Sequence, residues 1–405
     1  MSVVSVFPVS LFTNFSFISD SFFWRMFMLK RKVLLFLGLI MMVWVSAAQA
    51  YVGLCCAHCG GNMPLNIFGG GIPEPKEFRF KVSQMIMEMG PLRDGTDDIS
   101  NDDLLGGQNV NGTTYPALPT SMQMYMTMFG AAYSFSDNFA MMGMVNYIEN
   151  TMHMDLNNGN NFVMTSGGIG DITLLGKYRA YANDNLVPTN QMSVLFGLSL
   201  PTGAIDRKFT NHSNDTFNGT LLPYKMQLGS GTVDPIIGFT YQGSRDPFWW
   251  GLNTQLETHL YDNSQGYHRA QELRYDLYAM KQVHDKVVVH AQLNGWYEGT
   301  YSGEADDQRN SGAGRANLNN NRGYISPLFD PNNYGGHKVH VGLGVQFQPI
   351  PLHIMEVTAS VPIHQDLNGP QMADNWMVQF SYYLEVPTKN SRRYKGFNPP
   401  KALGF

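Results

Sequence analysis

The sequence predicts an all-β protein: a transmembrane antiparallel up-and-down β-barrel of the outer-membrane type, with about twelve strands. Three observations predict this fold class. Stretches of about ten residues alternate apolar with polar side chains, as strands between lipid and a wet lumen do. Short and long connections alternate along the chain, and an export signal precedes the first strand.

Composition narrows the class of protein. The chain has 405 residues, of which 43% are hydrophobic and 15% charged, and its formal net charge is −5. A disordered chain would combine low hydrophobicity with high charge, and a nucleic-acid-binding protein would be basic. Only one long uncharged run is present, which excludes a polytopic helical membrane protein. We therefore expect no nucleic-acid partner.

The N-terminal region reads as an export signal. Lys30, Arg31 and Lys32 form a positive segment, residues 33–47 are apolar, and Ala48-Gln49-Ala50 is a small-residue cleavage site. We assign residues 26–50 to a signal peptide and residues 1–25 to a mis-assigned upstream extension. The alternative, a membrane-anchoring helix, would need about 20 apolar residues.

Charged residues occur in the middle of several predicted strands, on one face of each. In residues 268–278, Glu272, Arg274 and Asp276 alternate with Leu273, Tyr275 and Leu277. Charges cannot face lipid cheaply, so the charged face is predicted to line a wet lumen. The predicted lumenal polar residues are Lys177, Arg179, Glu257, His259, Glu272, Arg274, Asp276 and His290.

The strands and connections define the barrel over residues 77–386. The predicted strands lie near 77–89, 121–135, 139–153, 170–181, 190–200, 233–242, 248–260, 267–280, 286–299, 337–347, 353–363 and 375–386. The predicted longer connections are 90–120, 154–169, 201–232, 261–266, 300–336 and 364–374. Periplasmic turns are short and extracellular loops are long, so both termini are expected in the periplasm of a diderm bacterium. A soluble β-sandwich, the competing fold, gives no reason for this alternation.

Aromatic residues near strand ends are typical of the interfacial girdles of such barrels. We assign this role to Trp249, Trp250, Tyr261, Tyr267, Trp296, Trp376, Tyr382 and Tyr383.

Three motifs resemble a known family. They are GIGDITLLGKYR at residues 168–179, Leu200-Pro201-Thr202-Gly203, and GSGTVDP at residues 229–235. Their order and spacing are similar to those of the family of outer-membrane transporters named after the meta-cleavage pathway of phenol degradation. The resemblance implies a barrel that passes small, often apolar compounds, and it brings no established set of binding residues.

All cysteines lie in one short segment that has two interpretations. Cys55, Cys56, His58 and Cys59, with Met63 close behind, offer soft ligands that suit Cu(I) or Zn. The alternative is a disulfide, most easily Cys56 with Cys59, because adjacent cysteines bridge poorly. The segment is not a haem attachment site, which would need His directly after Cys-x-x-Cys.

Methionines form stripes on three consecutive predicted strands, from a total of 25 in the chain. Hairpin pairing would place Met85, Met87 and Met89 beside Met122, Met124 and Met126 inside the lumen. Thioethers bind soft cations, so the stripes could form a copper route. Methionine is also a flexible apolar filler that suits promiscuous hydrophobic sites. A third interpretation turns the stripes toward lipid.

The remaining segments complete the prediction. Residues 51–76, rich in Pro and Gly, are expected to enter the periplasmic mouth or lumen as a partial plug, and residues 387–405 to form a basic periplasmic tail. No nucleophile motif, phosphate loop or zinc helix signature is present, so we expect no enzyme and no required cofactor. The predicted function is an outer-membrane channel for small apolar or aromatic solutes. The alternatives are a copper-binding or copper-uptake barrel and a non-conducting structural barrel.

Overall fold

A computed structural model describes residues 63–67, 69, 75–107, 114–184, 188–210, 218–305, 323–350 and 352–391. Contacts divide the chain into two units, Met1–Ala50 and Tyr51–Phe405, and every described residue belongs to the second. The proposed upstream extension and signal peptide lie outside the described residues. None of the helices in the described part of the chain is long and apolar enough to span a membrane.

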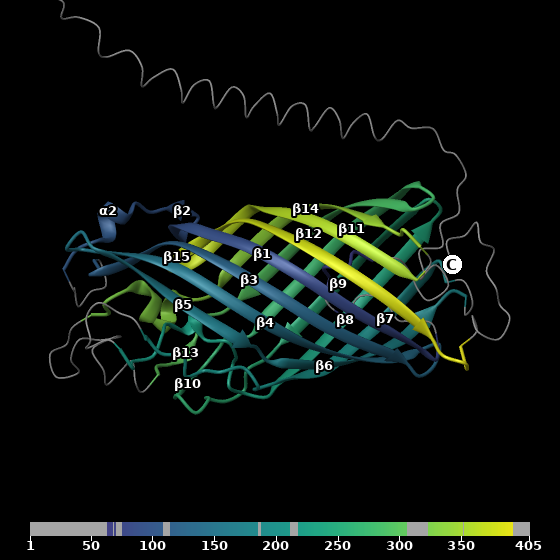
Figure 1. Ribbon diagram of the computed structural model, residues 1–405, viewed down its shortest axis with the longest axis horizontal. Helices are drawn as coiled ribbons and strands as arrows, with labels where there is room; N and C mark the ends of the chain where they lie inside the picture. The colour runs from purple at the N-terminus through teal and green to yellow at the C-terminus, as the bar shows by residue number, and fades with distance from the viewer. Residues whose placement is uncertain are drawn as a thin grey trace, which may run out of the picture. The chain divides into compact units, whose positions relative to one another are not determined.

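The second unit is built from long strands with short helices in its connections (Figure 1). The strands are β1 (Glu77–Gly95), β2 (Asp97–Asp98), β3 (Ala117–Ser134), β4 (Phe139–Leu156), β5 (Asn161–Ile169), β6 (Ile172–Ala182), β7 (Asn190–Leu200), β8 (Asp234–Arg245), β9 (Phe248–Glu257), β10 (Tyr267–His268), β11 (Glu272–His284), β12 (Val287–Glu298), β13 (Ser302–Gly303), β14 (Gly336–Phe347) and β15 (His353–Pro387). The helices are α2 (Asn101–Leu104), η1 (Tyr224–Met226), η3 (Pro327–Phe329) and η4 (Pro331–Asn333).

The main sheet closes on itself. Among the described residues it contains 13 strands, and β1 pairs with β15 as well as with β3, which joins the two ends of the strand order. β2 and β5 lie outside this ring, so eleven labelled strands form the closed wall. All the pairings in the wall are antiparallel. Closure leaves no strand edge to expose backbone groups to lipid.

β15 crosses the wall twice. Its first part pairs with β14 and its last part with β1, antiparallel in both cases. The two parts meet at Gly369, which has a left-handed backbone conformation, and the Glu385 N–H donates to the Leu352 carbonyl. β15 therefore consists of two antiparallel arms joined by a tight turn. A single strand of 35 residues would be about 115 Å long. The eleven labelled strands therefore make twelve crossings, as the sequence predicts.

Burial alternates as expected for a barrel. Phe78 and Phe80 on β1 are 41% and 44% exposed, while Arg79 and Lys81 on the opposite face are 6% and 9% exposed. Leu277 on β11 is exposed, whereas Asp276 bonds inside the wall to Asn253 and Asn294. The apolar face thus points outward and the charged face inward. The fold class predicted from the sequence is confirmed.

Three predicted connections are wrong in part. Residues 154–169 were expected to be a loop, but most of them extend β4 and form β5, because Met152 and Met154 pair with Met164 and Phe162. Residues 364–374 belong to the β15 hairpin, and β1 and β3 extend into 90–120. Asn, Asp and Gly in these stretches suggested loops, yet a buried apolar stripe continues through them.

Several predicted girdle aromatics point inward. Trp249, Tyr267 and Tyr383 are 7%, 1% and 8% exposed, and the Trp296 ring contacts the buried His340. Each lies on the lumenal side of its strand or in a folded connection, so position near a strand end did not establish contact with the interface.

The connections distinguish two ends of the barrel. At one end the turns are brief, such as 135–138 between β3 and β4 and 246–247 between β8 and β9. At the other end lie longer segments, including 201–233 and 299–335. These ends are called the short-turn end and the long-loop end.

Candidate functional site in the barrel lumen

The segment Met63–Ile67, with Gly69, lies inside the barrel in its short-turn half. Glu356 accepts hydrogen bonds from the Leu65 N–H at 2.9 and 2.8 Å, one to each carboxylate oxygen, and from the Asn66 N–H at 3.2 Å. Lys81 Nζ donates to the Leu65 carbonyl at 2.5 Å. Wall side chains of opposite charge therefore hold the backbone of one peptide stretch.

Amide side chains of the wall add further bonds to the same segment. Asn66 and Gln292 exchange two side-chain hydrogen bonds of 3.1 and 3.0 Å. Gln346 Nε2 donates to the Met63 carbonyl at 3.0 Å and to Glu356 Oε2 at 2.7 Å. Gln242 Nε2 lies 3.7 Å from Met63 Sδ.

Apolar packing also holds this segment in place. The wall residues that contact residues 63–67 and Gly69 are called the seat. Met63, Leu65 and Ile67 are buried against wall residues that point into the lumen. The wall members of this cluster are Trp249, Tyr278, Met280, Val288, Ile354 and Tyr383. Trp249 and Tyr383 lie on the lumenal face of their strands, and both rings pack beside the N-terminal segment.

Three of the predicted lumenal residues lie in the same half. Lys177 is fully buried and donates through Nζ to the Gly69 carbonyl at 3.2 Å. His290 Nε2 lies 3.3 Å from Glu356 Oε2. Arg179 Nε donates to Asn138 Oδ1 at 3.0 Å in the turn between β3 and β4. Lys177 therefore belongs to the seat and His290 adjoins it through Glu356, while Arg179 stabilises a turn.

The methionine stripes meet across adjacent strands. Met85, Met87 and Met89 of β1 pair directly with Met126, Met124 and Met122 of β3. Met122 in turn pairs with Met152 of β4, and Met152 with Met164 of β5. Met89, Met122, Met152 and Met164 are each at most 8% exposed, so the stripe faces inward over this part of the wall.

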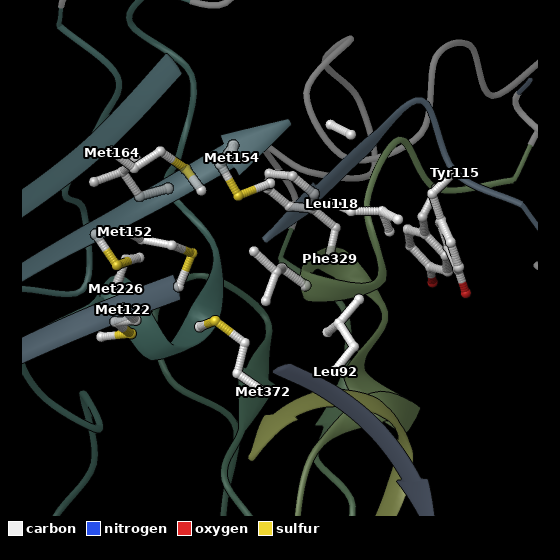
Figure 2. Packing of buried hydrophobic residues seen from close by; sticks show 14 of the residues in the cluster. Leu92, Tyr115, Leu118, Met122, Met152, Met154, Met164, Met226, Phe329 and Met372 are labelled. Carbon is white, nitrogen blue, oxygen red and sulfur yellow. The ribbon is translucent and has the colours of Figure 1, made fainter. Parts of the chain in front are cut away.

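The long loops fill the lumen over this stripe. Met226 at the end of η1 and Phe329 at the end of η3 are buried in the same cluster as the wall methionines. Figure 2 shows Met226 among Met122, Met152 and Met164, with Phe329 nearer Leu118 and Met154. The buried methionines of this group, called the methionine cluster, are Met89, Met122, Met152, Met154, Met164, Met226 and Met372.

An open cleft adjoins the methionine cluster. Its volume is about 730 Å³, it lies between β3–β5 and residues 206–210, and its lining includes the exposed Tyr125 and Glu149. Asn150, Ser166 and Arg207 are among its lining residues, and Leu222 belongs both to the lining and to the methionine cluster. A cleft of this size can hold a small organic solute.

Asp171 of the first motif ties the long loop to the wall beside this cleft. Its two carboxylate oxygens accept from the Gly203 N–H at 2.8 Å and the Ser230 N–H at 2.7 Å. Gly203 and Gly229 approach so closely that a Cβ on Gly229 would lie 2.5 Å from Asp171 Oδ1. The three sequence motifs therefore meet at one structural junction.

The remaining predicted lumenal residues gather toward the long-loop end. Glu272 and Arg274 form an ion pair on β11, and Asp276 accepts from Asn294 at 2.7 Å and Asn253 at 3.2 Å. Glu257 and His259 lie near Asp234. Burial lowers the pKa of His259, although the neighbouring Asp234 acts in the opposite direction. The lowered pKa favours a neutral imidazole.

Tyrosines organise the loops above these charges. Tyr224, Tyr267, Tyr301 and Tyr334 form a buried cluster in which the Tyr301 and Tyr334 rings stack at 4.5 Å. Burial raises the pKa of Tyr301 and of Tyr334 well above the usual value, so both hydroxyls stay protonated. Tyr334 donates to the Leu328 carbonyl and thereby fixes η3.

Of the five predicted metal ligands, only Met63 is among the described residues. Cys55, Cys56, His58 and Cys59 lie outside the described residues, while Met63 lies in the seat at the short-turn half. Met63 belongs to a different apolar cluster from the wall methionines.

Sequence reasoning missed the importance of Glu356 and Asp234. Glu356 alternates with outward Met355 and Val357, which is the same signal that identified the other lumenal charges. Asp234 is the next-to-last residue of the third motif, from which the sequence analysis draws only the resemblance to a family.

Comparisons with known proteins agree with this architecture. A family model described as "Putative MetA-pathway of phenol degradation" matches residues 105–333. An outer membrane channel from Pseudomonas putida F1 has the same fold, with a TM-score of 0.51, 9% identity, and coverage of 80% of this chain and 100% of that chain. That protein is described as an outer membrane channel.

Two other solved structures are less similar. The TodX monoaromatic hydrocarbon channel, in a deletion mutant, gives a TM-score of 0.38 at 8% identity and covers 76% of this chain and 91% of that chain. A Pseudomonas aeruginosa FadL homologue gives 0.35 at 8% identity, with 77% and 90% covered. No curated protein matches the sequence.

Proposed function

Because the chain belongs to the phenol-degradation family whose model it matches, we propose that it is an outer-membrane channel for small apolar or aromatic solutes. The observation that carries the proposal is the methionine cluster inside a closed barrel. A buried apolar cluster offers ions and sugars no hydrogen-bonding partners, whereas flexible thioether side chains adapt to apolar solutes of different shape.

The cleft beside the methionine cluster is mostly polar. Its lining includes Glu149, Asp206, Arg207 and Lys208, with Leu222 at the edge of the methionine cluster. A solute with an apolar ring and a polar substituent would place the ring against the methionine cluster and the substituent in this cleft. In this proposal the long-loop end is extracellular and both chain termini are periplasmic, as the loop lengths indicate.

The seated N-terminal segment makes the channel a gated one. Residues 63–67 occupy the short-turn half of the lumen through hydrogen bonds and apolar contacts. Such contacts can be broken and remade, so release of this segment would open the periplasmic exit. The segment is therefore proposed to act as a plug.

Proteoliposome uptake tests the proposal. Purified protein in vesicles should admit a radiolabelled monoaromatic alcohol faster than protein-free vesicles, and substitution of Met122 and Met152 by Gln should slow entry without unfolding the barrel. Equal uptake by vesicles that contain the wild-type protein, vesicles that contain the Gln variant and protein-free vesicles would instead favour the non-conducting structural barrel.

Copper binding remains a second candidate because thioethers gather in the methionine cluster. Metal analysis of the full chain after incubation with Cu(I) tests it. Copper that is retained by the intact chain but lost in a Cys55/Cys56/Cys59→Ser variant would place the site in the N-terminal segment. Copper lost only on Met122→Leu with Met152→Leu would place it in the methionine cluster. Retention by neither chain would remove the candidate.

A further inference from the structure

We propose that Asp234, Glu257 and His259 form a binding site for a divalent transition-metal ion of the zinc type, at the long-loop end of the lumen. The ligand atoms of these three residues lie within 4.8 Å of one another. Asp234 and His259 are buried, and Glu257 is half-buried.

Strand pairing brings the three side chains together. Ile236 of β8 pairs with Glu257 of β9, and the Thr258 N–H donates to the Pro235 carbonyl, so the pairing continues past the end of β9. This register sets Asp234 opposite His259. Glu257 and His259 are two residues apart and so share the lumenal face.

The orientation of His259 favours a ligand role. Its Nδ1 lies 2.9 Å from the Ala270 carbonyl, which can only accept a hydrogen bond, so Nδ1 carries the proton. His259 Nε2 then faces Asp234 Oδ2, 3.4 Å away. A cation between the nitrogen and the oxygen satisfies both atoms, and a backbone carbonyl on the far nitrogen is the usual support of a metal-bound histidine.

The geometry matches a tetrahedral ion. An ion with bonds of about 2.1 Å to each ligand holds neighbouring ligand atoms about 3.4 Å apart. The observed separation of His259 Nε2 and Asp234 Oδ2 has this value. Asp234 is held in place by the hydroxyls of Ser230 and Thr232, at 2.6 and 2.5 Å. A modest movement of Glu257 would bring its carboxylate to the third position.

The ligand types and local charges indicate the metal class. Two carboxylates and one imidazole suit zinc and its neighbours, whereas calcium and magnesium prefer oxygen alone. The two carboxylates balance a divalent ion. Two cations lie nearby, and each has a partner of its own, because Arg274 pairs with Glu272 and Arg269 donates to the Gly229 carbonyl at 2.9 Å. Both arginines also attract the Glu257 carboxylate, so a bound metal ion would compete with them for it.

Cobalt binding tests the site in the full chain. Co²⁺ reports its ligands by its visible spectrum, and a Cys55/Cys56/Cys59→Ser background removes thiolate ligands from the N-terminal segment. We expect this protein in detergent to bind one Co²⁺ with a spectrum typical of oxygen and nitrogen ligands, and Zn²⁺ to displace it.

Matched variants locate the ion. His259→Asn and Asp234→Asn should each weaken binding at least about tenfold. His268→Asn should leave binding unchanged, because His268 forms a comparable pair with the exposed Asp262, 2.6 Å apart, in a neighbouring loop. Binding should also raise the melting temperature of the background protein and not that of Glu257→Gln.

Two results would overturn the proposal. One is the absence of Co²⁺ binding by background protein that is folded by circular dichroism. The other is equal Co²⁺ affinity in the background, His259→Asn and His268→Asn proteins. In either case NMR evidence for an imidazolium would explain the contact as an ion pair of His259 with Asp234.

Discussion

Glu356 holds residues 65 and 66 of the proposed plug, and replacing it by Gln should open the proposed channel. The carboxylate accepts from the Leu65 N–H through both oxygens and from the Asn66 N–H. Glutamine keeps the length of the side chain but replaces one acceptor oxygen with an amide donor. That donor would face a backbone N–H, and the attraction between residue 356 and Lys81 would be lost.

The size of the effect follows from these contacts. A hydrogen bond to a charged group contributes about 1.5–3 kcal/mol, and a buried donor left unpaired costs about 1–3 kcal/mol. We therefore expect Glu356→Gln to favour release of the plug by about 3 kcal/mol. Since each 1.4 kcal/mol changes an equilibrium tenfold, the released fraction should rise about 100-fold.

Planar-bilayer recording measures this fraction as open probability. Asp374→Asn is the matched control, because Asp374 is also a buried carboxylate with several partners, Lys338 and His340 among them. It lies toward the long-loop end, away from residues 63–69. Glu356→Gln should show frequent openings, whereas the wild type and Asp374→Asn should stay mostly closed.

A specific result would refute the reasoning. If Glu356→Gln is folded, as judged by heat-modifiable migration, and its open probability equals that of Asp374→Asn and the wild type, then Glu356 does not hold a gate.

Three further predictions concern the loops and the wall. Asp171→Asn should weaken the hydrogen bonds to Gly203 and Ser230 and make proteolysis of the 201–233 loop about tenfold faster. The control Asp155→Asn, at an exposed position on β4, should not change the rate of cleavage, and equal cleavage of the two variants would contradict the junction at Asp171. Met226→Ala should create a cavity that costs about 2–5 kcal/mol of local packing and should raise the rate of aromatic-solute uptake; an unchanged rate would show that Met226 does not obstruct the path. Phe196→Arg, at the middle of β7 with 47% exposure, should destabilise the inserted barrel by about 2–4 kcal/mol in urea titrations, and Phe196→Leu should be nearly neutral; equal midpoints would mean that Phe196 does not face lipid.

The sequence predicted the wall of the barrel well because the two-residue period of a strand is imposed by the lipid outside and the polar lumen inside. The bounds of β7 were predicted to the residue, and the face occupied by Glu272, Arg274 and Asp276 was correct. The pairing of Met87 with Met124 followed from the same period, since register in a hairpin decides which side chains meet.

What could not be predicted depends on contacts between segments far apart in the chain. Leu65 and Glu356 are 291 residues apart, and no local pattern links a backbone N–H to that carboxylate. Trp249 and Tyr383 lie on the alternating lumenal face of their strands, but no local pattern shows that residues 63–67 pack against them. Loop composition hid the full length of the two arms of β15, because Asn368 and Gly369 signal a turn without showing how closely the strands follow it.

A nitroxide scan through residues 273–278 of β11, with the protein in lipid vesicles, tests the sealed wall most directly. Labels at 273, 275 and 277 should collide preferentially with oxygen dissolved in lipid, and labels at 274, 276 and 278 with a water-soluble nickel complex or with neither reagent. Uniform access of the nickel complex at all six positions, or a reversed alternation, would contradict an apolar exterior around a polar lumen.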